Sequence, residues 1–238
     1  MNQEHINNIV IESLNDIRSV KRKKINFPKL LSKVNPYSLA TSCITADNIV
    51  DYVLLKHKQT SSETIWGNYL ELIALKISTQ TLNAFKSKES CTDLEWVKEN
   101  KNHYRGWKSS PNWANADLKT TANNKERELN SRDNFGSYKV LTSYGKTQKR
   151  KSTKSFVQLS GQDAWDEITN DSEMYNKVII AIDNNRDQIN MFLESIYESD
   201  KEKSVQWVKT NFEGDNKIDY TKINQYISGR DKLHTTKF

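Results

Sequence analysis

Residues that interrupt regular structure are scarce in this chain, which has three prolines and seven glycines among 238 residues. A sequence poor in both leaves little room for flexible low-complexity linkers. Cysteine is also rare, because Cys43 and Cys91 are the two in the chain. Two cysteines do not make a disulfide framework or a zinc site, and a reducing compartment suits them best. We therefore expect a cytoplasmic protein.

Long apolar runs are missing as well. No stretch reaches the roughly 18 apolar residues that a membrane span requires, and the first residues lack the basic and apolar regions of a signal peptide. We therefore expect no membrane partner. The chain is rich in charge instead: 28% of its residues are charged, and its formal net charge is +6. This basic excess allows nucleic acid or another anionic surface as partner.

The spacing of apolar residues predicts helices at both ends of the chain and a few strands between them. Helices are expected over residues 1–20, about 46–56, 61–80, 113–130, about 175–198, 201–212 and 220–228, and around Trp165. Strands are expected over residues 92–97, 103–109, 137–144 and 156–159. This order predicts an α/β or α+β fold with a small mixed sheet. We expect one domain, 1–238, with a core at 59–170 between helical parts at 1–58 and 171–238.

The first two expected strands should pair as a hairpin around residues 98–102. Because side chains alternate along a strand, Asp93 and Glu95 share one face of the first strand, and Gly106 and Lys108 share one face of the second. Pairing would bring Asp93 and Lys108 together at the open end of the hairpin. A carboxylate can hold a divalent cation and a lysine can orient an attacking water, so the pair suits a metal-dependent nuclease. Taken alone, such a pair is also compatible with a surface ion pair.

Two further carboxylates could complete such a metal site. Glu71 lies within an apolar stretch of an expected helix, where a carboxylate is costly unless it is paired or binds a cation. Glu95 lies two residues after Asp93, on the same strand face.

A second placement of the motif is open. Asp117 and Lys119 have the same acid–x–lysine spacing, with Asp93 still as the first acid. Pro111 argues against it, because a central strand running up to Asp117 would lose a ladder hydrogen bond at the proline. We therefore favour Lys108.

Small polar residues follow Lys108 and lead into the next expected helix. The N-terminus of a helix with such residues can bind phosphate, and asparagine side chains can read adenine edges. The basic run at 146–154 contains no acid and could clamp the DNA backbone, which would make binding strongly salt-dependent. The candidate DNA-binding residues are Ser109, Ser110, Asn112, Asn115, Lys119, Arg127, Lys149, Arg150 and Lys151.

Four blocks of the sequence, at residues 61–71, 92–96, 107–115 and 159–168, follow the order of motifs in a known family. The third, Trp-Lys-Ser-Ser-Pro-Asn-Trp-Ala-Asn, is similar to a K-S-G-P-N-x-x-N block that begins at the catalytic lysine. With them the chain resembles a type II restriction endonuclease of the PD-(D/E)xK superfamily, in the branch that cuts GGNCC-like interrupted palindromes. It departs from the pattern at Gly106, where the second acid normally lies, and at Ser110, where glycine is common.

The resemblance implies an α/β, restriction-endonuclease-like core and Mg²⁺-dependent hydrolysis of double-stranded DNA that leaves 5′-phosphates. The catalytic residues would be Asp93, Lys108, Glu71 and Glu95, with Asp93, Glu71 and Glu95 as metal ligands. A palindromic site implies a homodimer, and a restriction enzyme implies a cognate DNA methyltransferase as genetic partner. The alternative is a DNA-binding protein or repair-type nuclease of the same fold without a fixed recognition sequence.

Overall fold

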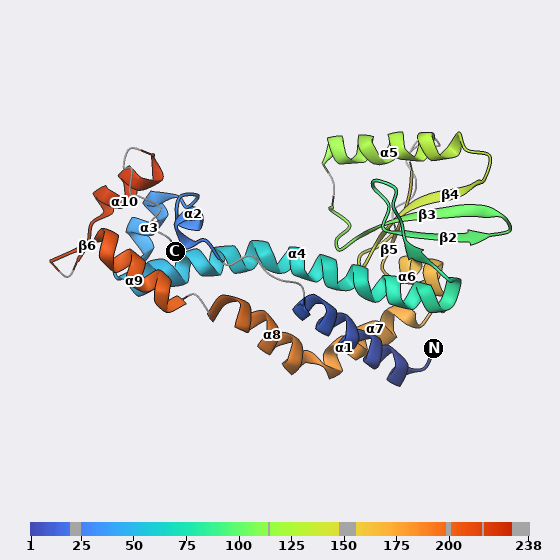
Figure 1. Cartoon of the computed structure of the whole chain (residues 1–238), viewed down its shortest axis with the longest axis horizontal. Helices are drawn as coiled ribbons and strands as arrows, with labels where there is room; N and C mark the ends of the chain where they lie inside the picture. The colour runs from blue at the N-terminus through green and yellow to red at the C-terminus, as the bar shows by residue number, and fades with distance from the viewer. Residues whose placement is uncertain (20–24, 114, 148–155, 199–200, 216, 230–238) are drawn as a thin grey trace. The chain divides into compact units, whose positions relative to one another are not determined.

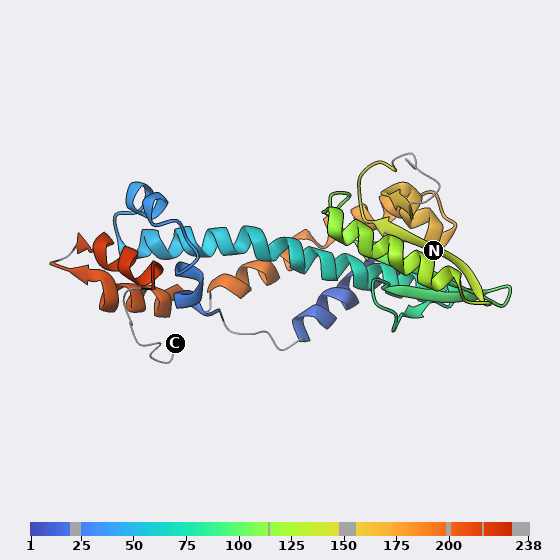
Figure 2. The same cartoon turned by 90° about the horizontal axis from the view of Figure 1, so that it is seen from above.

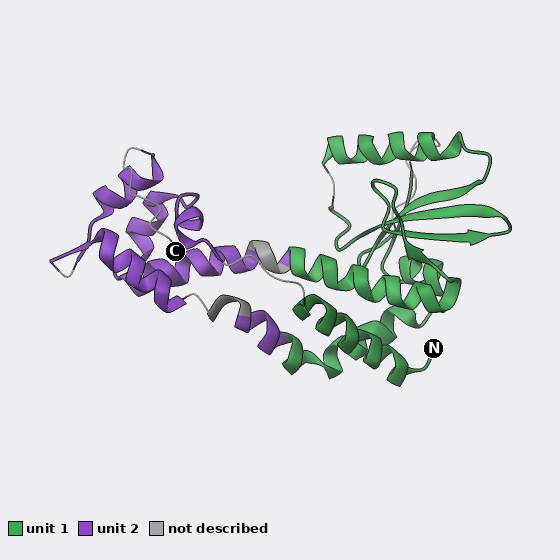
Figure 3. Ribbon diagram, viewed as in Figure 1, with its two compact units in different colours: residues 1–20, 64–189 green, residues 21–63, 190–238 purple. Residues whose placement is uncertain are grey.

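The structure is a computed structural model of the whole chain (Figure 1). It describes residues 1–19, 25–113, 115–147, 156–198, 201–215 and 217–229, and for 60–62 and 196–198 only the backbone. These residues form two compact units (Figure 3). Unit 1 comprises Met1–Val20 and Thr64–Ile189, and unit 2 comprises Lys21–Glu63 and Asn190–Phe238. The division of one domain at residues 58 and 170 stays a prediction.

Unit 1 contains a sheet and the helices that pack on it. Its helices are α1 (Gln3–Ser19), the second half of α4 (Ala46–Leu82), α5 (Ala116–Asn130), α6 (Gln162–Thr169) and α7 (Met174–Asn184). Its strands are β1 (Phe85–Lys86), β2 (Leu94–Lys98), β3 (Lys101–Lys108), β4 (Phe135–Thr142) and β5 (Val157–Ser160).

Unit 2 is mainly helical. It contains α2 (Phe27–Leu31), α3 (Pro36–Ser42), the first half of α4, most of α8 (Arg186–Glu198), α9 (Lys201–Phe212), the short strands β6 (Glu213–Gly214) and β7 (Lys217–Ile218), and α10 (Tyr220–Ile227). Its apolar core is built around Phe27, Leu39, Ile49 and Phe212, which are fully buried. No helix among the described residues of the chain is both long enough and apolar enough to cross a membrane.

The five strands of unit 1 lie in chain order, β1-β2-β3-β4-β5. β2 pairs antiparallel with β1 and β3, whereas β4 pairs parallel with β3 and β5, so the sheet is mixed. Helix α5 packs on the face that carries Tyr104 and Tyr138. Helix α6 packs on the opposite face, where Trp165 meets Trp107 with ring centroids 4.8 Å apart. The predicted α/β fold with a mixed sheet flanked by helices is confirmed (Figure 1).

Helix α4 is one continuous helix of 37 residues, seen end to end in Figure 2. The prediction of two helices, at 46–56 and 61–80, was wrong because Ser61, Ser62 and Thr64 were interpreted as a helix start. No proline or glycine lies between the two predicted helices, and Ser and Thr cost little in a helix interior. The opposite error occurred near residue 185, where the predicted helix 175–198 divides into α7 and α8 at Asn185.

The β2–β3 hairpin is tighter than predicted. Lys98 pairs with Lys101, so the turn consists of Glu99 and Asn100, both with positive φ (53° and 59°). Two residues with positive φ give a turn whose twist matches the paired strands. The ladder continues to Leu94 opposite Arg105. Its register therefore places Asp93, the next residue, beside Gly106.

Candidate active site

Asp93 and Lys108 are in contact at the end of the hairpin. The Lys108 Nζ lies 3.1 Å from Asp93 Oδ2, and their side chains are 32% and 19% exposed. The same Asp93 oxygen accepts a hydrogen bond of 2.6 Å from the backbone N–H of Trp107. Asp93 N–H in turn donates to the carbonyl of Arg105 at 2.8 Å. The carboxylate is thus fixed to the backbone of β3 while the pair remains open to solvent.

Gly106 leaves little space for the acid that the superfamily carries two residues before the lysine. A Cβ atom at this position would lie 3.0 Å from the carbonyl oxygen of Cys91, a contact tighter than most real Cβ atoms make. Cys91 has a φ of 61°, and its carbonyl accepts a hydrogen bond of 3.3 Å from the Tyr138 hydroxyl. The loop before Asp93 therefore occupies the space where the side chain of a second acid would begin.

Glu71 and Glu95, the two candidate replacements for that acid, each have another polar partner. Lys86 Nζ lies 3.1 Å from Glu71 Oε1, and the Ser87 hydroxyl donates to Glu95 Oε2 at 2.9 Å. No group of three His, Cys, Asp or Glu side chains suited to a metal occurs in the described part of the chain. The structure thus brings Asp93 to Lys108 but does not gather the three carboxylates, and their role as ligands stays a prediction.

Helix α4 nevertheless passes beside the segment that follows Lys108. A Cβ added to Gly67 would lie 3.6 Å from the Ser109 hydroxyl oxygen. Glu71 lies four residues further along α4, and residues four apart on a helix share a face. Glu71 therefore projects from the face of α4 that meets this end of the hairpin.

The segment after Lys108 is held by close packing of the Pro111 ring on Gly145, which in turn lies against Gly161. A Cβ at Gly145 would lie 2.9 Å from Pro111 Cγ, and a Cβ at Gly161 would lie 2.6 Å from the carbonyl of Gly145. The side chain of Trp113 adds a hydrogen bond of 3.4 Å to Gln158. The sequence analysis did not predict these contacts. Glycine is rare in this chain, so Gly145 and Gly161 could have been identified as positions of close packing.

The candidate DNA contacts differ in their exposure. Ser109 and Ser110 are half-buried, whereas Asn112, Asn115, Lys119 and Arg127 are exposed. Asn115 caps α5, because its side chain accepts a hydrogen bond of 3.0 Å from Leu118 N–H. Lys149, Arg150 and Lys151 lie outside the described residues. The alternative motif lies on a helix rather than a strand, since Asp117 and Lys119 belong to the first turns of α5.

The opposite face of the sheet carries a buried ion cluster that the sequence did not reveal. Arg105, 2% exposed, pairs with Glu167 of α6, and Lys139 Nζ lies 2.7 Å from the other oxygen of that carboxylate. Burial would raise the pKa of Glu167, but the charge of Arg105 and the hydrogen bond from Lys139 bring that pKa below its ordinary value. The guanidinium also lies over the Trp96 ring, 4.6 Å from its centroid. A cavity of about 780 Å³ borders this cluster.

A mixed sheet covered by helices on both faces defines a restriction-endonuclease-like fold, and an aspartate and a lysine are in contact at the end of its β2–β3 hairpin. The chain belongs to the family of type II restriction endonuclease EcoO109I, whose family model matches residues 3–190. It is therefore a site-specific deoxyribonuclease that acts on double-stranded DNA. The resemblance predicted from the sequence is confirmed, and the branch that cuts GGNCC-like sites fits this family. A search of curated proteins found no match.

Restoring the superfamily's acid by Gly106→Asp is expected to lower activity rather than raise it. The new Cβ would press on the Cys91 carbonyl, and the carboxylate would lie against that carbonyl oxygen at a buried position. We expect a loss of about 1 to 3 kcal/mol in unfolding free energy, measured by urea denaturation, together with slower DNA cleavage. A Gly106→Asp variant that cleaves faster than the wild type would show that the loop leaves room for the acid.

Proposed function

We propose that the chain hydrolyses phosphodiester bonds of double-stranded DNA in a Mg²⁺-dependent reaction that leaves 5′-phosphates. One observation carries this proposal: in a chain of the EcoO109I family, the carboxylate of Asp93 and the ammonium of Lys108 lie 3.1 Å apart on a half-exposed surface. A hard cation takes oxygen ligands, and the carboxylates in this region are of the type it prefers. Asp93 would hold the ion, and Glu71 or Glu95 would supply a further oxygen.

The protein residues have separate tasks in this proposal. The backbone N–H of Trp107 fixes one oxygen of Asp93 and so sets the direction of the carboxylate. Lys108 presents an ammonium group that can orient the attacking water and stabilise charge on the phosphoryl oxygens. A bound Mg²⁺ would supply further charge neutralisation and would lower the pKa of a coordinated water.

The DNA itself would be held by the segment after Lys108 and by the helix that follows. Ser109, Ser110, Asn112 and Asn115 precede α5, whose N-terminus favours anions. Lys119 and Arg127 lie further along the same helix and are exposed to solvent. Lys149, Arg150 and Lys151 would add contacts to the backbone and make binding sensitive to salt.

The symmetry of the expected DNA recognition site suggests the oligomeric state of the enzyme. An interrupted palindrome has two-fold symmetry, so we propose a homodimer in which each subunit cuts one strand. We also propose that the enzyme works in the cytoplasm beside a DNA methyltransferase that protects the host sequence.

Digestion of a mixed DNA substrate in Mg²⁺ tests this function. We expect discrete fragments whose ends, once sequenced, share one interrupted palindrome. We also expect the ends to ligate directly, without a kinase step, because they carry 5′-phosphates. A smear of fragments would favour a nuclease without a fixed recognition sequence, and intact DNA over a wide range of Mg²⁺ concentrations would contradict the proposal.

A further inference from the structure

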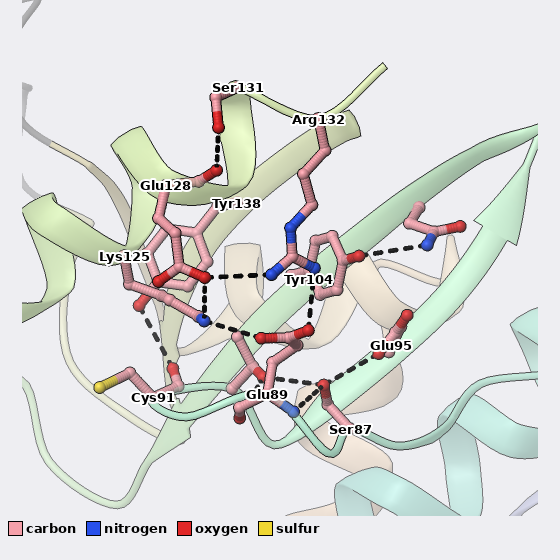
Figure 4. Close-up of polar contacts among 12 residues, drawn as sticks. Ser87, Glu89, Cys91, Glu95, Tyr104, Lys125, Glu128, Ser131, Arg132 and Tyr138 are labelled. Atoms are coloured by element: carbon pink, nitrogen blue, oxygen red, sulfur yellow. Dashed lines mark hydrogen bonds and ion pairs between the residues drawn. The ribbon is translucent and has the colours of Figure 1, made fainter. Parts of the chain in front are cut away.

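Four charged side chains form an ion-pair network between the loop that precedes Asp93 and the C-terminal part of α5 with the turn that follows it (Figure 4). Glu89 belongs to this loop, and its carboxylate lies 2.7 Å from Lys125 Nζ and 2.8 Å from Arg132. Glu128 bridges the same two cations at 2.9 and 3.0 Å. The Lys125 side chain is 6% exposed, so this ammonium is buried among its partners. Two acids and two bases balance in charge, which a buried lysine requires.

Glu89 is also the centre of the hydrogen bonds within its own loop. Its carbonyl accepts from both the backbone N–H and the hydroxyl of Thr92, at 3.3 and 2.7 Å. Its own N–H donates to the Ser87 hydroxyl at 3.2 Å, and that hydroxyl donates to Glu95. Thr92 is the residue next to Asp93. The loop is therefore held by its own backbone hydrogen bonds and by ion pairs to Lys125 of α5 and to Arg132, which follows α5.

The electrostatics agree with a fixed contact. Hydrogen bonds from Arg132 and Lys125 bring the pKa of Glu89 down to about 2, so the carboxylate stays charged at neutral pH. The hydrogen bond to Glu89 likewise raises the pKa of Arg132 above its ordinary value. Glu89 and Arg132 therefore both stay charged at neutral pH.

We propose that Glu89, held by Lys125 and Arg132, is a positioning residue for the metal-binding carboxylate of Asp93. This inference rests on the proposed function, in which Asp93 holds a divalent cation. Glu89 acts through Thr92 and through Cys91, whose carbonyl covers Gly106 where another enzyme would carry its second acid. The N–H of Trp107 sets the direction of the Asp93 carboxylate, and this loop holds the backbone that leads into Asp93. Groups that hydrogen-bond directly to a metal ligand typically change metal affinity or activity 10- to 100-fold when they are removed, and Glu89 acts one contact further from Asp93, through Thr92.

Two single substitutions test the role of the network. Glu89→Gln removes the central charge and keeps the size of the side chain. Arg132→Gln removes the ion pairs of Arg132 with Glu89 and Glu128, at a side chain that is 35% exposed. The matched control is Asp171→Asn, which breaks an ion pair of 2.7 Å with Lys177 elsewhere in unit 1. For each protein, the cleavage rate of one defined duplex is measured across Mg²⁺ concentrations, together with the melting temperature.

We expect the Mg²⁺ concentration for half-maximal cleavage to rise about tenfold or more in Glu89→Gln and by a smaller factor in Arg132→Gln. The rate at saturating Mg²⁺ should stay within about threefold, and the Asp171→Asn control should keep the wild-type half-saturation. If melting temperature falls while half-saturation is unchanged in both variants, the network only stabilises the fold and the inference is wrong. A wild-type protein that does not cleave DNA would instead refute the proposed function itself.

Discussion

Asp93→Asn is expected to slow DNA cleavage by about a thousandfold or more while the fold is kept. Asparagine can still accept the hydrogen bond from Trp107 N–H, so the local backbone should not change. It loses the negative charge that pairs with Lys108 and that would hold the cation. Charge stabilisation by a bound metal is worth several kcal/mol in a transition state, and about 4 kcal/mol corresponds to a thousandfold in rate. The measurement is single-turnover cleavage of a defined duplex.

The control for Asp93→Asn is Asp133→Asn, which removes an exposed acid elsewhere in unit 1. This variant should cleave at the wild-type rate. DNA binding without Mg²⁺ should be equal or tighter in Asp93→Asn, because a negative charge near the phosphates is gone. Cleavage by Asp93→Asn at more than about a tenth of the wild-type rate would exclude Asp93 as an essential metal ligand.

The second large effect concerns stability. Glu167→Gln is expected to lower the free energy of unfolding of unit 1 by about 3 kcal/mol, because it leaves the buried Arg105 guanidinium without its counter-charge. Urea denaturation followed by tryptophan fluorescence measures this loss, since Trp96, Trp107 and Trp165 are buried in the same unit. Asp166→Asn, at an exposed neighbouring position on α6, is the matched control and should change stability little.

The result would also show what the buried cluster does. Arg105 donates to Glu167, to the Ser137 carbonyl and to the Tyr104 carbonyl, so it joins β3, β4 and α6. If Glu167→Gln unfolds at the same urea concentration as the wild type, the ion pair contributes no net stability, as some buried pairs do not.

The alternation of side chains along the two strands predicted the contact between Asp93 and Lys108. Asp93 and Lys108 were expected to meet because residues at these positions share a face, and the structure places them in contact. The prediction survived an error in the turn: the hairpin closes at Glu99 and Asn100, and the resulting register still leaves Asp93 within reach of Lys108. The lysine side chain is long enough to reach Asp93 despite this change in the register of the hairpin.

Other features could not be predicted because they depend on contacts between distant segments. The Cys91 carbonyl reaches Gly106 only when the loop from Ser87 to Thr92 folds back on the hairpin, and that loop depends on α5. Arg105 appeared as one basic residue of an expected strand, and only the packing of α6 shows that it is buried. In α4 the error was local, since a Ser-Ser-Glu-Thr segment is compatible with both a helix start and a helix interior.

The most direct test of the catalytic centre compares two lysines in the same experiment. Lys108→Met and Lys119→Met each remove one ammonium, and they separate the hairpin site from the alternative motif on α5. Single-turnover cleavage at saturating DNA and Mg²⁺ should fall by about a hundredfold or more in Lys108→Met. The single-turnover rate of Lys119→Met should stay within about threefold of the wild-type rate. The expected effect of Lys119→Met is a weaker affinity for DNA. Wild-type cleavage by Lys108→Met, or loss of cleavage in Lys119→Met alone, would contradict an active site built on Asp93 and Lys108.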